Sequence, residues 1–164
     1  MFFENASVDD VSEIMLNRFE ELVLPFWEKA KKDTSYTLHE IITLASIIEK
    51  EAQKKSERKI ISSVYHNRLN KKMFLAACPT IKYALDWPTK KVYYEQLDVK
   101  SPYNTYKNKG LPPGPIANPG IESIKAAVYP AKTNYYYFVA KKDGSHIFSS
   151  TFQGHQQGRQ ESKK

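Results

Sequence analysis

The fold is decided by one stretch of the chain, LHEIITLASIIEKEAQ at positions 38–53. It opens on Thr37-Leu38-His39-Glu40, which matches the capping box that starts many helices. At about 100° per residue, apolar side chains cluster within about 40° of Ile41 on a helical wheel. The clustered residues are Ile41, Ala45, Ile48 and Ala52. The stretch therefore predicts a helix with one buried face.

An acid interrupts that face. Glu49 lies about 80° from Ile41, inside the apolar sector, whereas Glu51 lies about 280° away at the border of the polar face. Burial raises the pKa of a carboxyl group, and a protonated acid at neutral pH is what glycosidic or acyl cleavage needs from a general acid. Glu49 is therefore the candidate catalytic residue. The alternative is a structural ion pair with a base such as Lys54 or Arg68.

The two acids of this stretch cannot act as a facing pair. Glu49 and Glu51 diverge by about 160°, whereas the two carboxylates of an ordinary glycosidase flank one bond, roughly 5–9.5 Å apart. Unless another acid such as Asp86 or Glu57 folds in, the site has one carboxylate. A single carboxylate points away from an ordinary hydrolase.

The flanking segments predict an α+β domain that is mostly helical, with a small antiparallel hairpin near the C-terminus. Apolar spacing predicts further helices, and β-prone residues around Lys142-Asp143-Gly144 predict the hairpin. The expected helices cover about 8–28, 57–70, 78–85 and 121–129, and the expected strands 135–139 and 145–148. The polar tail, 153–164, is expected to fray. We expect a single domain over residues 1–164.

Residues 101–120, SPYNTYKNKGLPPGPIANPG, form a long irregular stretch that holds five of the nine prolines. Loops of this length are usually functional or disordered, and the Tyr, Leu and Ile side chains in this one favour order. Its Tyr, Asn and Thr side chains offer aromatic faces, hydroxyls and amides that suit a sugar. Alternatively, they satisfy the backbone of the loop itself.

Composition narrows the classes of partner. The 25 Lys and Arg residues against 18 Asp and Glu give a formal charge of +7, which favours nucleic acid, a membrane surface or an acidic polymer. No nucleic-acid recognition motif is present. Cys78 is the single cysteine, and the four histidines are scattered without metal-ligand spacing, so we expect no metal and no cofactor. No apolar run approaches the roughly 20 residues of a membrane-spanning helix.

A series of motifs resembles the endolytic murein transglycosylase (YceG-like) family. In chain order they are LASIIEKE at 44–51, SER at 56–58, VYHNRL at 64–69, PTIKYAL at 79–85, SPYNTY at 101–106, GLPPGPIANPG at 110–120, AKT at 131–133, YFVA at 137–140, HIFS at 146–149 and His155. The resemblance covers nearly the whole chain. One departure is Ala76-Ala77-Cys78, where the family often has Gln-x-Asp or Gln-x-Cys before Pro-Thr.

The resemblance implies a bacterial cell-wall enzyme that cuts within peptidoglycan glycan strands without hydrolysis. It would leave 1,6-anhydro-N-acetylmuramic acid ends and use a single glutamate, carried over as Glu49, first as general acid and then as base. The implied partners are glycan strands and cell-wall synthases (penicillin-binding proteins), with no nucleic acid. The implied location is the extracytoplasmic face of the cytoplasmic membrane. We expect 1–164 to be the catalytic domain alone, with the family's membrane anchor and LysM-like region outside it.

We expect the substrate to be held by side chains from the irregular stretch and from two other motifs. These are Tyr103, Asn104, Thr105, Tyr106 and Asn118, together with Asn67 and Thr80. Two alternatives stay open. One is a non-catalytic peptidoglycan-binding domain, and the other is a muramidase that uses water as the nucleophile.

Overall fold

The computed structural model describes residues 7–86 and 92–163. The chain forms two compact units, one within Met1–Leu38 and the other within His39–Lys164. The expected single domain over 1–164 stays a prediction. Among the described residues, no helix is both long enough and apolar enough to span a bilayer.

The first unit is helical. It contains α1 (Val8–Leu22), α2 (Leu24–Ala30) and the 3-10 turn η1 (Lys31–Asp33). The Ser7 hydroxyl caps α1 by accepting a hydrogen bond from the Asp10 N–H at 3.1 Å. The sequence predicts one continuous helix here, and the structure divides it at Val23. Pro25 explains the break, because it has no N–H to continue the ladder and suits the first turn of a new helix.

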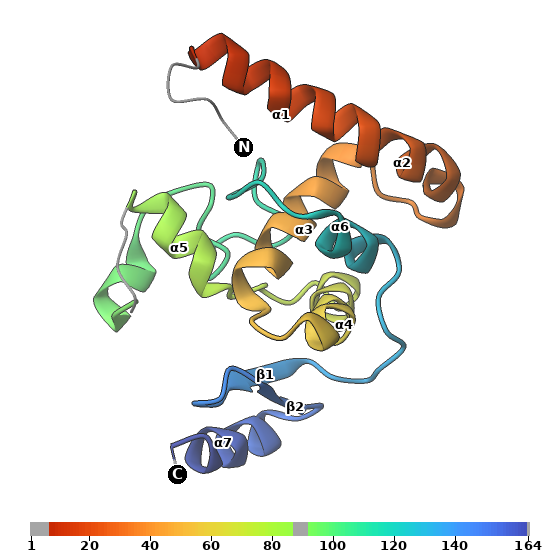
Figure 1. Cartoon of the computed structure of the whole chain (residues 1–164). Coiled ribbons are helices and arrows are strands. Elements are labelled where there is room, and N and C mark those ends of the chain that lie inside the picture. The colour runs from red at the N-terminus through yellow and green to blue at the C-terminus, as the bar shows by residue number, and fades with distance from the viewer. Residues whose placement is uncertain (1–6, 87–91, 164) are drawn as a thin grey trace. The chain divides into compact units, whose positions relative to one another are not determined.

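The second unit is built around α3 (Leu38–Glu51), which lies centrally in Figure 1. The helices that follow it are α4 (Arg58–Asn70), after the turn η2 (Lys55–Glu57), then α5 (Cys78–Ala84), the 3-10 turn η3 (Tyr94–Asp98) and α6 (Ile121–Val128). The middle of α3 is buried on nearly all sides, at Ile41, Thr43, Leu44, Ala45, Ser46, Ile47 and Ile48. It is therefore a core helix, and the sequence prediction of one buried face was incomplete.

A small hairpin and a terminal helix close this unit. Strands β1 (Tyr137–Ala140) and β2 (His146–Ser149) pair antiparallel, with Tyr137 opposite Ser149. Helix α7 (Phe152–Glu161) packs on both strands, as Figure 1 shows at the C-terminal end. The expectation that the tail frays is therefore wrong for residues 153–161, and its last residue, Lys164, lies outside the described residues. Thr151 caps α7 through the Gly154 N–H at 3.1 Å, and Gly158 approaches so closely that a Cβ would lie 3.1 Å from Ile147.

The proline-rich stretch is ordered by bonds to α3. The Pro113 carbonyl lies 2.8 Å from His39 Nε2, and the Ile116 N–H donates to the Ser46 hydroxyl at 3.0 Å. A mostly helical domain with an ordered proline-rich loop and a small antiparallel hairpin confirms the expected α+β class.

Candidate functional site

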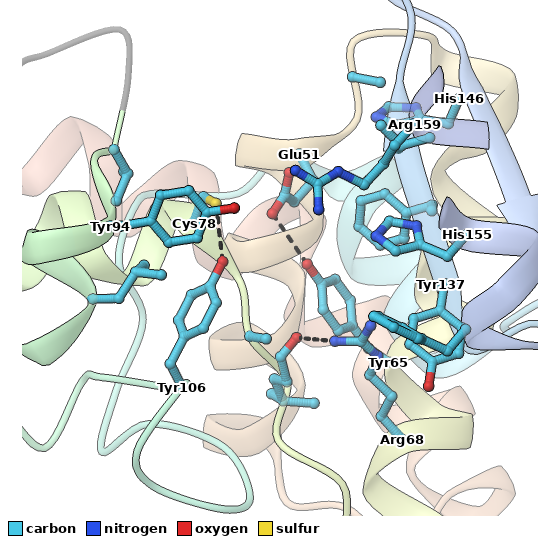
Figure 2. Close-up of a pocket in the computed structure, with 18 residues that line it drawn as sticks. Glu51, Tyr65, Arg68, Cys78, Tyr94, Tyr106, Tyr137, His146, His155 and Arg159 are labelled. Carbon is cyan, nitrogen blue, oxygen red and sulfur yellow. Dashed lines mark hydrogen bonds between the residues drawn. The ribbon is translucent and has the colours of Figure 1, made fainter. Parts of the chain in front are cut away.

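A cavity of about 680 Å³ opens in the second unit. Figure 2 shows its walls, which come from the end of α3, from α4, from the start of α5, from η3, from the hairpin and from α7. Its volume falls in the range of roughly 300–1,000 Å³ usual for ligand sites. Among the described residues that line it, Glu51 is the only carboxylate. The cavity therefore combines the volume of a ligand site with one carboxyl group that could serve acid–base chemistry.

Glu51 is the last residue of α3, and its carboxyl group enters the cavity. The Tyr65 hydroxyl of α4 donates a hydrogen bond to Glu51 Oε1 at 3.2 Å. Burial raises the pKa of Glu51 to about 7, although the Tyr65 hydrogen bond and the charges of Lys82 and Arg68 pull it down. A carboxyl group with this pKa is populated in both protonation states near neutrality. It can therefore give up a proton and take one back.

Arg68 places a second charge in the cavity wall. Its Nε donates to the Tyr136 carbonyl at 2.7 Å and its Nη1 to the Leu75 carbonyl at 2.7 Å. The guanidinium also lies 5.3 Å from the centre of the Tyr137 ring. These contacts set the position from which the Arg68 charge lowers the pKa of Glu51.

His146 on β2 is committed to a partner. Its Nδ1 lies 2.7 Å from Glu57 Oε2, and its backbone N–H donates to Glu57 Oε1 at 3.1 Å. Glu57 does not line the cavity. It therefore tethers the hairpin to the start of α4 and supplies no second acid beside Glu51.

Cys78 and Tyr106 line the opposite side of the cavity (Figure 2). The Cys78 Sγ and the Tyr106 hydroxyl lie 3.1 Å apart. Burial raises the pKa of both groups, so both are neutral at physiological pH and contribute hydrogen-bonding groups and surface without charge.

Glu49 lies elsewhere, at the first turn of α6. The Ser123 hydroxyl donates to Glu49 Oε2 at 2.5 Å, the Gly120 N–H donates to the same oxygen at 3.2 Å, and Arg58 Nη2 lies 3.3 Å from Oε1. Burial opposes ionisation of Glu49, but the bonds from Ser123 and Gly120 and the Arg58 charge outweigh it and lower its pKa. The expectation that apolar neighbours keep this acid protonated is wrong. It forms the structural ion pair, with Arg58 in place of the expected Lys54 or Arg68.

Three of the expected substrate ligands are fully buried. Asn104 donates to the Leu97 and Val99 carbonyls at 2.9 and 2.8 Å and accepts from the Tyr106 N–H at 2.9 Å. Thr105 and Thr80 bond each other at 2.9 Å and also bond Ala77. The structure therefore does not support direct contact of these three side chains with a ligand, because they are buried and bond backbone groups of the loop and of the segments beside it.

The other four expected substrate ligands do not lie together in one site. Asn67 donates to the Thr133 and Tyr135 carbonyls at 3.0 and 2.8 Å and so holds the chain that enters β1. Tyr103 packs on the Tyr83 ring with 4.6 Å between centres. Asn118 is exposed. Of the seven expected substrate ligands, Tyr106 is the one that lines the Glu51 cavity.

Glu51 and Tyr65 line the cavity and bond each other, and the sequence did not place either of them in the site. A signal for Glu51 was present. Leu44 and Ile47 lie at about 300° and 240° on the wheel, and both are fully buried. Glu51, at about 280°, falls between them and so lies on a second buried face. The apolar residues Leu44 and Ile47, which lie away from the first face, could have indicated that α3 is buried on more than one side.

No group of three or more His, Cys, Asp or Glu side chains within 7–86 and 92–163 is placed to hold a metal ion.

Comparison with known proteins identifies the family. The YceG-like family model matches residues 1–161. The chain is 42% identical over 156 residues to the endolytic murein transglycosylase of Bacillus subtilis (strain 168), covering 95% of this chain and 43% of that protein. It is 32% identical over 142 residues to the protein of the same name from Streptococcus pneumoniae (strain D39), covering 84% of this chain and 26% of that protein.

A solved structure supports the same family assignment. The crystal structure of a yceG-like protein from Listeria monocytogenes matches with a TM-score of 0.86 and 41% identity, over 96% of this chain and 50% of that chain. The chain thus spans half or less of the length of these relatives. The match of the family model to nearly every residue shows that the chain belongs to the YceG-like family.

Proposed function

We propose that this chain carries the catalytic centre of an endolytic murein transglycosylase in which Glu51 is the single acid and base. The observation that carries the proposal is one carboxyl group with a pKa of about 7 in a cavity of ligand size. The names of the Bacillus and Streptococcus relatives support the activity and peptidoglycan as the substrate. The expected role of Glu49 passes to Glu51, because the pKa of Glu49 is lowered.

The first half of the reaction needs an acid. Protonated Glu51 gives its proton to the glycosidic oxygen while the bond from that oxygen to C1 of the muramic acid breaks. The leaving sugar departs with a free hydroxyl, and Glu51 becomes a carboxylate. The Tyr65 hydroxyl is suited to both states, since a hydroxyl can accept a hydrogen bond from the acid or donate one to the carboxylate.

The second half needs a base. The Glu51 carboxylate takes the proton from the C6 hydroxyl of the same muramic acid as its oxygen bonds to C1, which closes the 1,6-anhydro ring and restores the acid. No water is consumed. Because the nucleophile belongs to the sugar, its effective concentration is high and no second carboxylate is required to activate water.

The proposed activity also implies a location and partners. Peptidoglycan lies outside the cytoplasmic membrane, so we infer that the protein acts on that face. Enzymes that extend the same glycan strands, the penicillin-binding synthases, are then candidate partners.

The masses of the products distinguish a transglycosylase from a hydrolase. We expect purified glycan strands to be cut internally, with new muramic acid ends lighter by one water than hydrolytic ends. Mass spectrometry of the fragments measures this difference. Hydrolytic ends would show a muramidase, and strands that bind without shortening would show a binding domain; either result would contradict the proposal.

Replacing Tyr65 by phenylalanine is expected to move the pH profile. The Tyr65 hydrogen bond favours the charged form of Glu51 and so lowers its pKa, and removing it raises that pKa further above its ordinary value. Cleavage requires the protonated acid in the first step, so the alkaline decline of kcat/KM moves to higher pH, by about 0.5–1 unit for one hydrogen bond.

Tyr94→Phe is the matched control, because Tyr94 lines the same cavity and no hydrogen bond joins it to Glu51 within the described chain. Its pH profile should equal that of the unmodified chain. An alkaline decline that does not move in Tyr65→Phe would show that the hydroxyl does not act on Glu51.

A further inference from the structure

One stripe of α7 faces the cavity. At about 100° per residue, Phe152, His155 and Arg159 fall within about 60° of one another, and all three line the cavity. Gly158 lies on the face of α7 toward the hairpin instead, where a Cβ would come within 3.1 Å of Ile147. This close packing fixes the rotation of α7, and with it the direction of the stripe.

The charges of the cavity do not balance. It is lined by Arg68 and Arg159 but by one carboxylate, Glu51. Arg68 is held by the Tyr136 and Leu75 carbonyls, and His146 by Glu57. Arg159 is exposed, and among the described residues no carboxylate pairs with it. The N–H groups of the Arg159 guanidinium can therefore donate hydrogen bonds to a ligand in the cavity.

His155 lies on the same stripe of α7 as Arg159, and its ring carries no charge. Its ring stacks on Tyr137, with 5.4 Å between centres. Burial lowers its pKa, and the nearby charges of Arg159 and Arg68 lower it further. His155 is therefore neutral at physiological pH, and its Nδ1 is buried without a partner in the described chain. A neutral ring one turn before Arg159 leaves the positive charge of the stripe concentrated on the guanidinium.

We propose that Arg159 on α7 binds a carboxylate of the peptide side arm carried by the glycan, and so makes the chain prefer peptide-bearing strands. The inference rests on the proposed function. A guanidinium presents paired N–H donors that match a carboxylate in geometry and charge. An acidic side arm held at Arg159 also balances the charge of the cavity and sets the position of the sugar that bears it.

The test is a binding measurement in the Glu51→Gln background, where the substrate is not consumed. Three polymers are compared: native strands with their peptides, the same strands with carboxyl groups amidated by methylamine, and strands stripped of peptides by an amidase. Arg159→Gln should weaken binding of native strands about fivefold at low salt, the effect of about 1 kcal/mol for an exposed pair. Amidated and stripped strands should bind equally well with and without the change.

Two further variants separate recognition from general charge. Arg159→Lys should keep part of the preference, since the charge remains and the paired geometry is lost. Lys100→Gln removes the same charge from an exposed position outside the cavity, and it should leave all three affinities unchanged.

Several results would overturn the assignment. Equal losses on native and amidated strands would show that no carboxylate is recognised. A loss on stripped strands would assign Arg159 to the lactyl carboxylate that stripping exposes on the sugar, and no loss on native strands would remove Arg159 from binding altogether. Native strands that bind through Arg159 but are never cut by the unmodified chain would contradict the transglycosylase proposal and leave this one standing.

Discussion

Glu51→Gln is expected to reduce the rate of strand cleavage by about 10²–10⁴-fold, the usual contribution of a positioned acid–base group. Glutamine keeps the shape of the side chain and can still accept a hydrogen bond from Tyr65, whose hydroxyl lies 3.2 Å from the carboxyl oxygen. It cannot deliver a proton to the glycosidic oxygen. The measurement is the rate at which new ends form at neutral pH, with urea unfolding to show that the fold is kept.

Glu49→Gln is the matched control, two positions away on the same helix. It removes the charge paired with Arg58 at 3.3 Å and should lower the free energy of unfolding by about 1–3 kcal/mol. Cleavage should continue wherever the chain is folded. Cleavage that survives Glu51→Gln but is lost in a folded Glu49→Gln chain would return the catalytic role to Glu49.

Asn104→Ala is expected to lower the free energy of unfolding by about 3 kcal/mol. The side chain is fully buried, and its removal leaves two carbonyls and one N–H without the bonds that Asn104 makes to Leu97, Val99 and Tyr106. Unsatisfied buried groups cost about 1–3 kcal/mol each, and partial relaxation reduces the sum. Urea unfolding at constant pH measures the change.

Asn118→Ala supplies the comparison within the same proline-rich stretch. Asn118 is exposed, so its replacement should change stability by no more than about 0.5 kcal/mol. An Asn104→Ala chain of normal stability with a raised KM would restore Asn104 as a sugar ligand. Equal stability losses in both variants would mean that burial of Asn104 does not decide the outcome.

The helices and the hairpin could be predicted because their signals are local. Apolar spacing placed α3, α4, α5 and α6 close to their observed positions, and the β-prone residues around Gly144 gave the hairpin. The break at Val23 was missed because the apolar spacing continues through it. Pro25 was the available sign.

The terminal helix and the site residues could not be predicted in this way, because they depend on contacts between segments far apart in the sequence. The helix α7 has a polar sequence and is stabilised by packing of Gly158 against Ile147 on the hairpin, which no local pattern reveals. Asn104 looked like a sugar ligand because an amide in a loop suits either role, and only burial separates the two. The choice between Glu49 and Glu51 likewise rested on what surrounds α3, since Arg58 and Ser123 reach Glu49 from other helices.

The bonds that hold Glu49, together with the buried side chains in the middle of α3, set the rotation of the helix that carries both acids. Ser123, Gly120 and Arg58 grip Glu49 on one side of α3, while Glu51 points about 160° away. Rotating α3 by one residue position, about 100°, would break these bonds to Glu49 and move Glu51 out of the cavity. In the proposed mechanism the two acids therefore have different roles: the ionised Glu49 helps to hold α3 in its orientation, and Glu51 exchanges the proton.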